Sequence, residues 1–226
     1  MLGFLFKNRF ELFISTQLLI LFGSLFFPVE FFENRMLPTL FLLNIIAGVI
    51  LLSEKKLLSR LLLILFAISV IAFGVTIGSK KNEMGGAALV RLVAFFVFHL
   101  IVAYHIILQV WKARKVNKKV IIGLMSGYIS LGFLAFFLFI TIEILQPGSF
   151  KGDLLSAASI EMRGDALMYH AFITLLTIGY GDISPATSLA QKAAMLVALA
   201  GQFYMVIITA IVVGKFLIQS NWGKQA

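Results

Sequence analysis

Six long apolar runs constrain the fold of this chain more than any other feature of its sequence. They cover residues 10–27, 36–53, 57–77, 87–110, 120–145 and 187–218. A helix needs about 20 consecutive apolar residues to cross the ~30 Å hydrocarbon core of a bilayer. Each run reaches or approaches that length. The sequence therefore predicts an all-α membrane protein with six transmembrane helices per chain.

Composition agrees with a lipid environment and argues against several classes of function. The 226 residues are 61% hydrophobic and 13% charged, whereas soluble domains are usually about half apolar and a quarter charged. Cysteine is absent, which excludes disulfides and thiolate metal sites. No acid–base pair, nucleophile arrangement or phosphate loop stands out, so neither an enzyme nor a cofactor is predicted. The net charge of +9 does not indicate nucleic-acid binding, because the basic residues flank the apolar runs.

The positions of the charges orient the predicted helices. With both termini in the cytoplasm, twelve of the nineteen lysines and arginines, but two of the ten acids, lie on the cytoplasmic side. An excess of basic residues on that side is the usual rule for membrane proteins. We expect a multi-pass protein of a cell membrane (plasma or inner), with both termini cytoplasmic.

The stretch between the fifth and sixth runs does not span the membrane, yet it is too apolar for an ordinary loop. Residues 165–176 are expected to form a half-helix that begins at Asp165, a good N-cap residue. The carboxyl end of a helix carries partial negative charge. A re-entrant half-helix would direct that end to the membrane centre, where a cation would be stabilised.

A short motif follows this half-helix. It consists of Thr177, Ile178, Gly179, Tyr180 and Gly181, and Asp182 comes next. Successive carbonyl groups point the same way only if backbone handedness alternates, and glycine takes the left-handed conformation without steric cost. Four such strands would form rings of oxygens that replace the hydration shell of a K⁺ ion. A glycine-containing loop without this role is the weaker alternative.

The motif and its surroundings resemble the signature of the six-transmembrane-helix tetrameric potassium channel superfamily. The resemblance implies a homotetramer with one filter strand per chain, K⁺ as the permeant ion held at Thr177, Ile178, Gly179 and Tyr180, and no cofactor. It covers residues 120–219 by motif and the preceding helices by topology alone. The implied domains are a four-helix voltage-sensor-like domain (1–111), a linker (112–119) and a pore domain (120–226). The pore domain would contain an outer helix (120–145), a pore helix (165–176), the filter (177–181) and an inner helix (187–218).

Further residues are expected to support the filter or to gate the pore. Glu143 resembles the acid that ties the fifth helix to the outer pore in related channels, and Asp182, Tyr169 and Thr174 are expected to support the filter. His170 either brings proton sensitivity to the filter or packs as a neutral structural residue. Gly201 is either a hinge of the inner helix or a small residue for close packing. The remaining gating candidates on the inner helix are Thr209, Val213, Gly214 and Leu217.

The fourth helix lacks the repeated arginines of a voltage sensor. Arg91 is followed at every third position by Ala94, Val97, Leu100, Ala103 and Ile106. Moving one elementary charge through the membrane field supplies about 2.3 kcal/mol per 100 mV, so steep gating needs several charges per subunit. We therefore expect weak or absent voltage dependence.

The short connection after the fourth helix favours packing of each sensor-like domain against the pore of its own subunit. Its basic residues are candidates for binding anionic lipid, although setting the topology explains them equally well. They are Lys112, Arg114, Lys115, Lys118 and Lys119.

The leading functional hypothesis is passive, potassium-selective conduction. The alternatives are a subunit of a potassium-uptake transporter and a non-conducting regulatory subunit. Transporter subunits carry several degenerate filters in one chain, whereas this chain has one nearly complete filter. A regulatory subunit would fail to pass K⁺ when purified alone.

Overall fold

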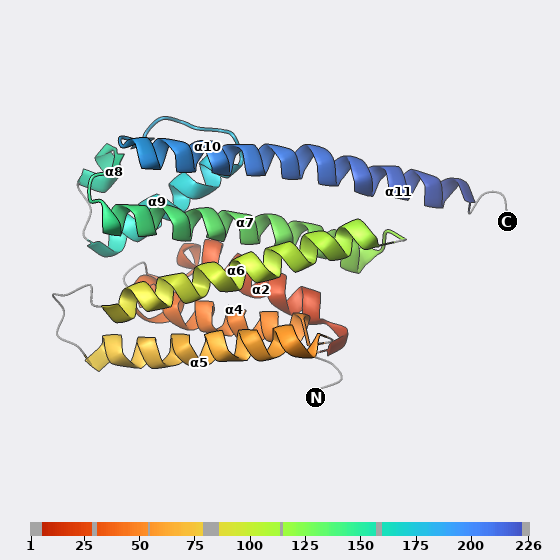
Figure 1. The fold of residues 1–226 in the computed structure, drawn as a ribbon, viewed down its shortest axis with the longest axis horizontal. Coiled ribbons are helices and arrows are strands. Elements are labelled where there is room, and N and C mark those ends of the chain that lie inside the picture. The colour runs from red at the N-terminus through yellow and green to blue at the C-terminus, as the bar shows by residue number, and fades with distance from the viewer. Residues whose placement is uncertain are drawn as a thin grey trace. The chain divides into compact units, whose positions relative to one another are not determined.

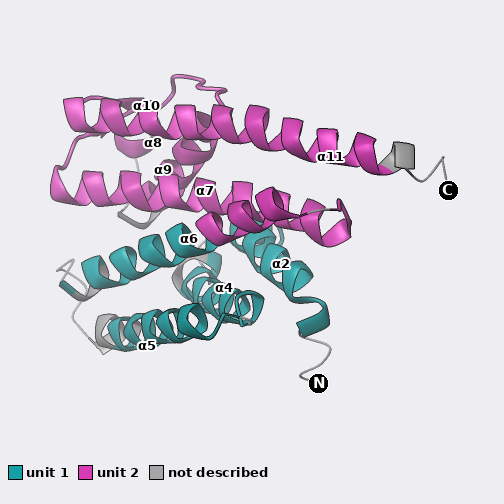
Figure 2. Cartoon of the chain, turned by 45° about the vertical axis from the view of Figure 1, so that its right-hand side comes forward, with its two compact units in different colours: residues 1–102 teal, residues 103–226 magenta. Residues whose placement is uncertain are grey.

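The computed structural model describes residues 6–28, 31–53, 55–78, 86–113, 115–156 and 160–222. The chain forms two compact units, residues 1–102 and 103–226 (Figure 2). The boundary falls inside one helix, α6 (Gly86–Lys112). The second unit therefore begins with the last part of that helix and not at the linker that follows it.

Unit 1 is built from helices. They are α2 (Arg9–Phe22), the 3₁₀ turn η1 (Gly23–Leu25), the π-helical segment η2 (Phe32–Met36), α4 (Leu37–Leu51), α5 (Lys56–Gly78) and the first part of α6 (Figure 1). Pro38 lies in the first turn of α4, directly after η2, so its missing N–H falls where the helix changes from π to α geometry. Helix α4 packs against both α2 and α5, so it is the central element of this unit.

Aromatic side chains fill the core of unit 1. Phe13 meets Phe98 edge to face with ring centroids 6.5 Å apart, and Phe41 stacks on Phe95 at 5.3 Å. Gly48 permits this packing, because a Cβ there would lie 2.6 Å from the ring of Phe98. Burying a phenylalanine side chain contributes about 1.5–3 kcal/mol. The first part of α6 is thus held on α4 by apolar packing.

Unit 2 contains two long helices and a shorter one between them. Its elements after α6 are α7 (Lys118–Leu145), β1 (Phe150–Lys151), α8 (Asp153–Ser156), α9 (Ile160–Leu175), β2 (Ser184–Pro185), α10 (Ser188–Phe203), the π-helical segment η3 (Tyr204–Ile208) and α11 (Thr209–Trp222). Helix α9 packs against both α7 and α10 (Figure 1). Strands β1 and β2 pair antiparallel, with Phe150 opposite Pro185.

Side-chain caps fix where the two long helices of unit 2 begin. The side chain of Asn117 accepts a hydrogen bond from the Val120 amide at 3.1 Å, and Thr187 Oγ1 accepts one from the Ala190 amide at 3.3 Å. Each cap satisfies one of the amides that a helix start leaves without a partner. The helices start within two residues of the predicted positions 120 and 187.

Within the described part of the chain, three helices are long and apolar enough to cross a membrane by length and composition. They are Leu89–Lys112, Lys118–Leu145 and Ser188–Gln219. Helices α2, α4 and α5 occupy the other three predicted runs, but α2 and α4 have 14 and 15 residues. The chain is therefore a membrane protein with several candidate spans, and the six-span topology stays a prediction.

One predicted helix boundary needs correction. Helix α9 begins at Ile160, so Asp165 lies inside this helix and is not its N-cap. Gly164, the residue before Asp165, lies inside the helix, at a cost of about 1 kcal/mol relative to alanine. The two compact units divide at 102/103, inside α6, and the domain boundary predicted at 111/112 stays a prediction. A Cβ at Gly127 would lie 3.1 Å from Cγ2 of Ile106.

Candidate functional site

The candidate filter follows α9, which is held tightly in unit 2. The ring of Phe172 occupies the space beside Gly132 of α7, where a Cβ would overlap it, and it meets Phe133 edge to face at 5.8 Å. On the other side, a Cβ at Gly201 of α10 would overlap the carbonyl oxygen of Leu175. Two glycines from two helices thus let α9 approach closely and fix where it ends.

Main-chain hydrogen bonds reverse the chain at the carboxyl end of α9. The Ile173 carbonyl oxygen accepts from the amides of Ile178 at 2.9 Å and Gly179 at 3.3 Å. The Thr177 amide donates to the Thr174 carbonyl at 3.0 Å. These bonds satisfy carbonyl groups that a helix end leaves without a partner. The first filter residues are therefore attached to the last turn of α9.

Backbone handedness alternates through the motif. Thr177, Gly179 and Gly181 have φ of +58°, +56° and +82°, whereas Ile178 and Tyr180 are not among the residues with positive φ. The positive values at both glycines confirm the expectation from the sequence. The value at Thr177 was not foreseen, since a non-glycine residue pays a steric cost in this region. Strain of this kind is concentrated at functional sites in proteins.

The filter strand is exposed in the single chain. Every residue from 176 to 182 is exposed, including Ile178 at 48% and Tyr180 at 70%. Tyr180 is expected to brace the strand against the surrounding helices of the pore, and its exposure in the single chain leaves that expectation a prediction. Exposed apolar side chains that form a contiguous group are typical of contact surfaces for protein or lipid, and Ile178 and Tyr180 belong to such a group.

The segment after the filter is held by the turn that follows α7. The Ala186 amide donates to the Ser149 carbonyl oxygen at 2.7 Å, and Thr187 Oγ1 lies 3.2 Å from Ser149 Oγ. Gly152 lies so close to the Asp182 carbonyl oxygen that a Cβ there would overlap it. Residues 182–187, just after the filter, are thus joined to the turn between α7 and α8 through Ser149 and Gly152.

Glu143 holds this turn in place. Its carboxylate accepts hydrogen bonds from the Gly148 amide at 2.9 Å and the Phe150 amide at 3.1 Å. Hydrogen bonds to an ionised carboxylate are about twice as strong as neutral ones. Glu143, at the end of α7, therefore stabilises the turn and the start of strand β1. Strand β1 in turn pairs with β2 just beyond the filter.

Two side chains of α9 lie near Asp182. The Asp182 carboxylate accepts a hydrogen bond from the Tyr169 hydroxyl, which raises the pKa of Tyr169; partial burial and the charge of Asp182 act in the same direction. His170 is buried between Phe139 and Phe150, with ring centroids 5.3 and 5.5 Å away. Burial lowers the pKa of His170, and the charge of Asp182 opposes this with a smaller effect. This environment favours the neutral, packing role of His170.

The predicted gating residues divide into one that is buried and several that are accessible. Gly201 is buried against Leu175, an environment typical of close helix packing. Thr209, Val213 and Leu217 are exposed in the single chain, and a Cβ at Gly214 would meet nothing within 4 Å. The departure from α-helical geometry lies between these groups, in the π-helical segment η3. A gating role for these residues stays a prediction.

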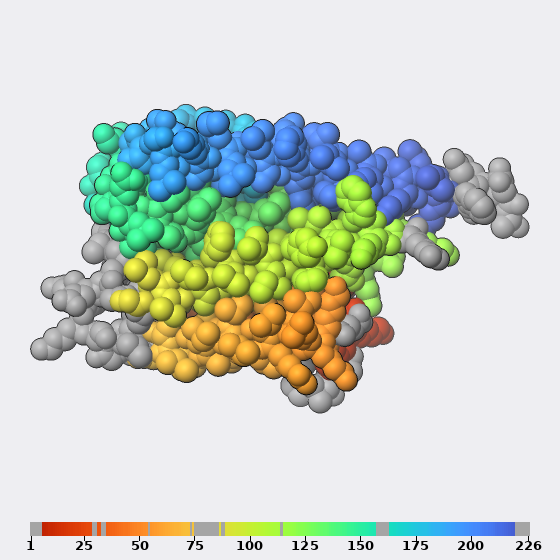
Figure 3. Space-filling model, viewed as in Figure 1, coloured from red at the N-terminus to blue at the C-terminus, as the bar shows by residue number. Residues whose placement is uncertain are grey.

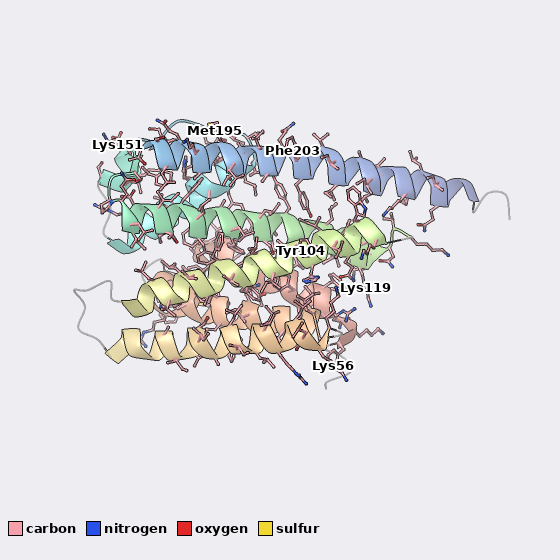
Figure 4. All side chains as sticks on the ribbon, viewed as in Figure 1. Lys56, Tyr104, Lys119, Lys151, Met195 and Phe203 are labelled. Atoms are coloured by element: carbon pink, nitrogen blue, oxygen red, sulfur yellow. The ribbon has the colours of Figure 1, made fainter. Side chains whose placement is uncertain are left out.

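The basic cluster near the linker lies at one end of unit 2. Lys112, Lys115, Lys118 and Lys119 are exposed, and Arg114 lies outside the described residues. Lys119 and Lys151 occupy opposite ends of the unit (Figure 4). This separation is what the predicted topology requires, since it places Lys119 inside and Lys151 outside.

Several residues with well-defined contacts were missed by the sequence analysis. The Lys215 ammonium group donates to the carbonyl oxygens of Val110 and Trp111, at 3.3 and 2.5 Å. The Val116 amide donates to Gln219 Oε1 at 2.9 Å. The carboxyl end of α6 and the linker are thus tied to α11 of the same chain. Polar residues near the ends of apolar runs were the available signal, because such groups need partners in a membrane.

Comparison with known proteins identifies the same region. Residues 155–218 match a family model described as an ion channel. The matched segment covers α9, the filter strand, α10, η3 and most of α11. The chain therefore carries an ion channel pore domain, and it is not an enzyme. No match was found among the curated proteins or among the solved structures.

Proposed function

We propose that the chain is one subunit of a homotetrameric, potassium-selective channel whose filter is formed by residues 177–181. The observation that carries this proposal is the alternation of backbone handedness at Thr177, Gly179 and Gly181. Alternation turns successive carbonyl oxygens to one side of the strand. Four such strands around an axis can replace the water around a dehydrated K⁺ ion.

The uneven burial of the long helices supports the assembly of several chains around one pore. In the most apolar window of Ser188–Gln219, 22% is buried, compared with 44% for Lys118–Leu145. The surface of α10 and α11 lies open along one face (Figure 3). Exposed apolar side chains on this helix include Met195 and Phe203 (Figure 4). In the proposed tetramer, other subunits cover part of this surface and the remainder lines the pore.

The proposed channel responds weakly or not at all to voltage. Arg91 is the basic residue of α6 before its last turn, and one charge per subunit supplies too little energy for steep gating. Six spans with both termini in the cytoplasm of a cell membrane complete the proposal. Anionic lipid at the basic cluster of residues 112–119 is a candidate partner.

Flux into liposomes tests the proposal. The purified protein is expected to pass K⁺ and to exclude Na⁺. Its K⁺ conductance should change little between membrane potentials of opposite sign. Gly179→Ala should abolish flux or selectivity, because alanine is strained at φ of +56°. Gly74→Ala is the matched control, since a Cβ at Gly74 of α5 meets nothing within 4 Å.

Three results would contradict the proposal. Equal passage of Na⁺ would exclude selectivity, and normal selectivity in Gly179→Ala would exclude the assigned filter. Absence of flux from correctly assembled protein would favour the regulatory-subunit alternative.

A further inference from the structure

Two tyrosines of unit 2 donate hydrogen bonds to main-chain carbonyl groups of other elements. The Tyr128 hydroxyl of α7 donates to the Leu175 carbonyl oxygen at 3.2 Å. The Tyr204 hydroxyl of η3 donates to the Leu124 carbonyl oxygen of α7 at 2.5 Å. The two rings are in contact, with centroids 5.3 Å apart and planes tilted by 46°. We call Tyr128 and Tyr204 the tyrosine pair.

The acceptor of the first bond lies at the base of the filter. Leu175 is the last residue of α9, so its carbonyl group has no partner in the next helical turn. Within the described residues, the Tyr128 hydroxyl is the donor found for it. The same carbonyl faces Gly201 closely enough that a Cβ there would overlap it. Tyr128 and Gly201 thus fix the orientation of the peptide group two residues before Thr177.

The second tyrosine stands where the inner helix changes its geometry. Tyr204 begins η3, the π-helical segment between α10 and α11. Segments of this kind are often found at functional sites, where a helix can change its direction. Gly127 of α7 leaves the space for the Tyr204 hydroxyl, because a Cβ there would lie 2.8 Å from it. The helix is therefore anchored to α7 at the point where its two halves meet.

We propose that the tyrosine pair couples the inner helix to the filter, with Tyr128 as a positioning residue for the filter base. A displacement of α11 shifts Tyr204 at η3. The contact between the rings transmits this shift to Tyr128. The hydrogen bond from the Tyr128 hydroxyl to the Leu175 carbonyl oxygen then changes in length and direction. The inference depends on the proposed function only in taking residues 177–181 as the conducting element.

Hydrogen–deuterium exchange of the assembled protein tests this coupling without requiring ion flux. Tyr128→Phe removes the hydroxyl and keeps the ring. The loss of one hydrogen bond is expected to speed exchange in residues 176–180 by roughly fivefold. Tyr204→Phe should speed exchange in the same residues by a smaller factor. Tyr104→Phe is the matched control, because Tyr104 is 61% exposed on α6 and its substitution should change nothing in the filter.

The double variant separates coupling from two independent effects. If the tyrosines act as a unit, Tyr128→Phe with Tyr204→Phe changes filter exchange by less than the product of the single effects. A product of independent effects, or exchange that rises throughout α7 and not in the filter, would overturn the proposal.

A second substitution strengthens the bond instead of removing it. Site-specific replacement of Tyr128 by 3,5-difluorotyrosine, measured at a pH low enough to keep the more acidic phenol protonated, makes the hydroxyl a better donor with little change in shape. Exchange in residues 176–180 should become slower, a result that loss of packing cannot produce. Unchanged or faster exchange would contradict a positioning role.

Flux measurements distinguish failure of this inference from failure of the proposed function. If wild-type protein selects K⁺ over Na⁺, Tyr128→Phe should lower that selectivity by roughly fivefold, and raised K⁺ should partly restore it because bound ions hold the filter in place. Wild-type protein without selectivity would refute the proposed function, while the exchange experiment would still decide the coupling.

Discussion

The two halves of the inner helix differ in how they are held. Helix α10 is capped by Thr187 and buries Ala190, Val197 and Gly201 against its own chain. In α11, the described apolar side chains are mostly exposed, and its polar ties are Lys215 and Gln219. The first half is therefore built into the filter scaffold by close packing. The second half is held by a few hydrogen bonds, and such a segment moves at a lower cost in free energy.

Gly201→Ala should have the largest effect on this contrast. The added Cβ overlaps the Leu175 carbonyl, so main-chain atoms must move, and the expected destabilisation is about 3 kcal/mol. The measurement is thermal unfolding of the protein in detergent. Gly214→Ala is the control, because a Cβ at Gly214 of α11 meets nothing within 4 Å. Equal unfolding temperatures of the two variants would contradict a tightly packed first half.

Glu143→Gln should have the second largest effect. Glutamine keeps the shape but removes the charge and replaces one of the two acceptor oxygens by an NH2 donor, so it can accept from only one of the Gly148 and Phe150 amides. The expected loss is about 2 kcal/mol, measured by the same unfolding assay. Exchange should become faster at residues 183–187, where the turn holds the start of α10. If the loss appears instead in α11, the turn does not secure the first half.

Lys215→Met should loosen the second half alone. The substitution removes the donor to the Val110 and Trp111 carbonyls, and because the site is partly accessible the expected cost is about 1 kcal/mol. Hydrogen exchange should become faster in α11 and stay the same in α10. Lys192→Met, a change on the exposed surface of α10, is the control. Faster exchange in both halves would show that they are not held separately.

Acidification should have the smallest effect, and it should act through His170. Burial lowers the pKa of His170, so the folded state favours the neutral ring while the unfolded chain binds a proton near pH 6.5. Stability should be constant well above that value and fall as the pH is lowered through it, with a loss of less than about 1 kcal/mol by pH 6. His170→Phe should reduce this dependence and leave the part that the buried His99 contributes. A decline of the same size in the variant would assign it to other groups.

Local sequence patterns predicted the parts of the fold that depend on near neighbours. The apolar runs located the long helices, and the glycines at 179 and 181 indicated the positive φ values. The supporting role of Glu143 was implied by the family resemblance, and its contacts lie within seven positions along the chain. Each of these features is decided within a few residues along the chain.

Contacts between distant residues could not be predicted in the same way. Tyr128 and Leu175 are 47 positions apart, and Lys215 lies 105 positions from Val110. No local pattern distinguishes a glycine that packs against a carbonyl, as at Gly201, from one that bends a helix. The π-helical segment η3 also lacks proline and glycine, so no residue type within it predicted the departure from α-helical geometry.

The exposed filter strand has a consequence for how the protein is made. Ile178 and Tyr180 are exposed in the single chain, so under the proposed function the conducting structure is completed only when chains assemble. In the proposed tetramer every pore contains four copies of each residue. A chain with a defective filter that still assembles would therefore prevent conduction through the pore that it shares with normal chains. If equal amounts of both kinds mix at random, about one pore in sixteen would be free of defective copies.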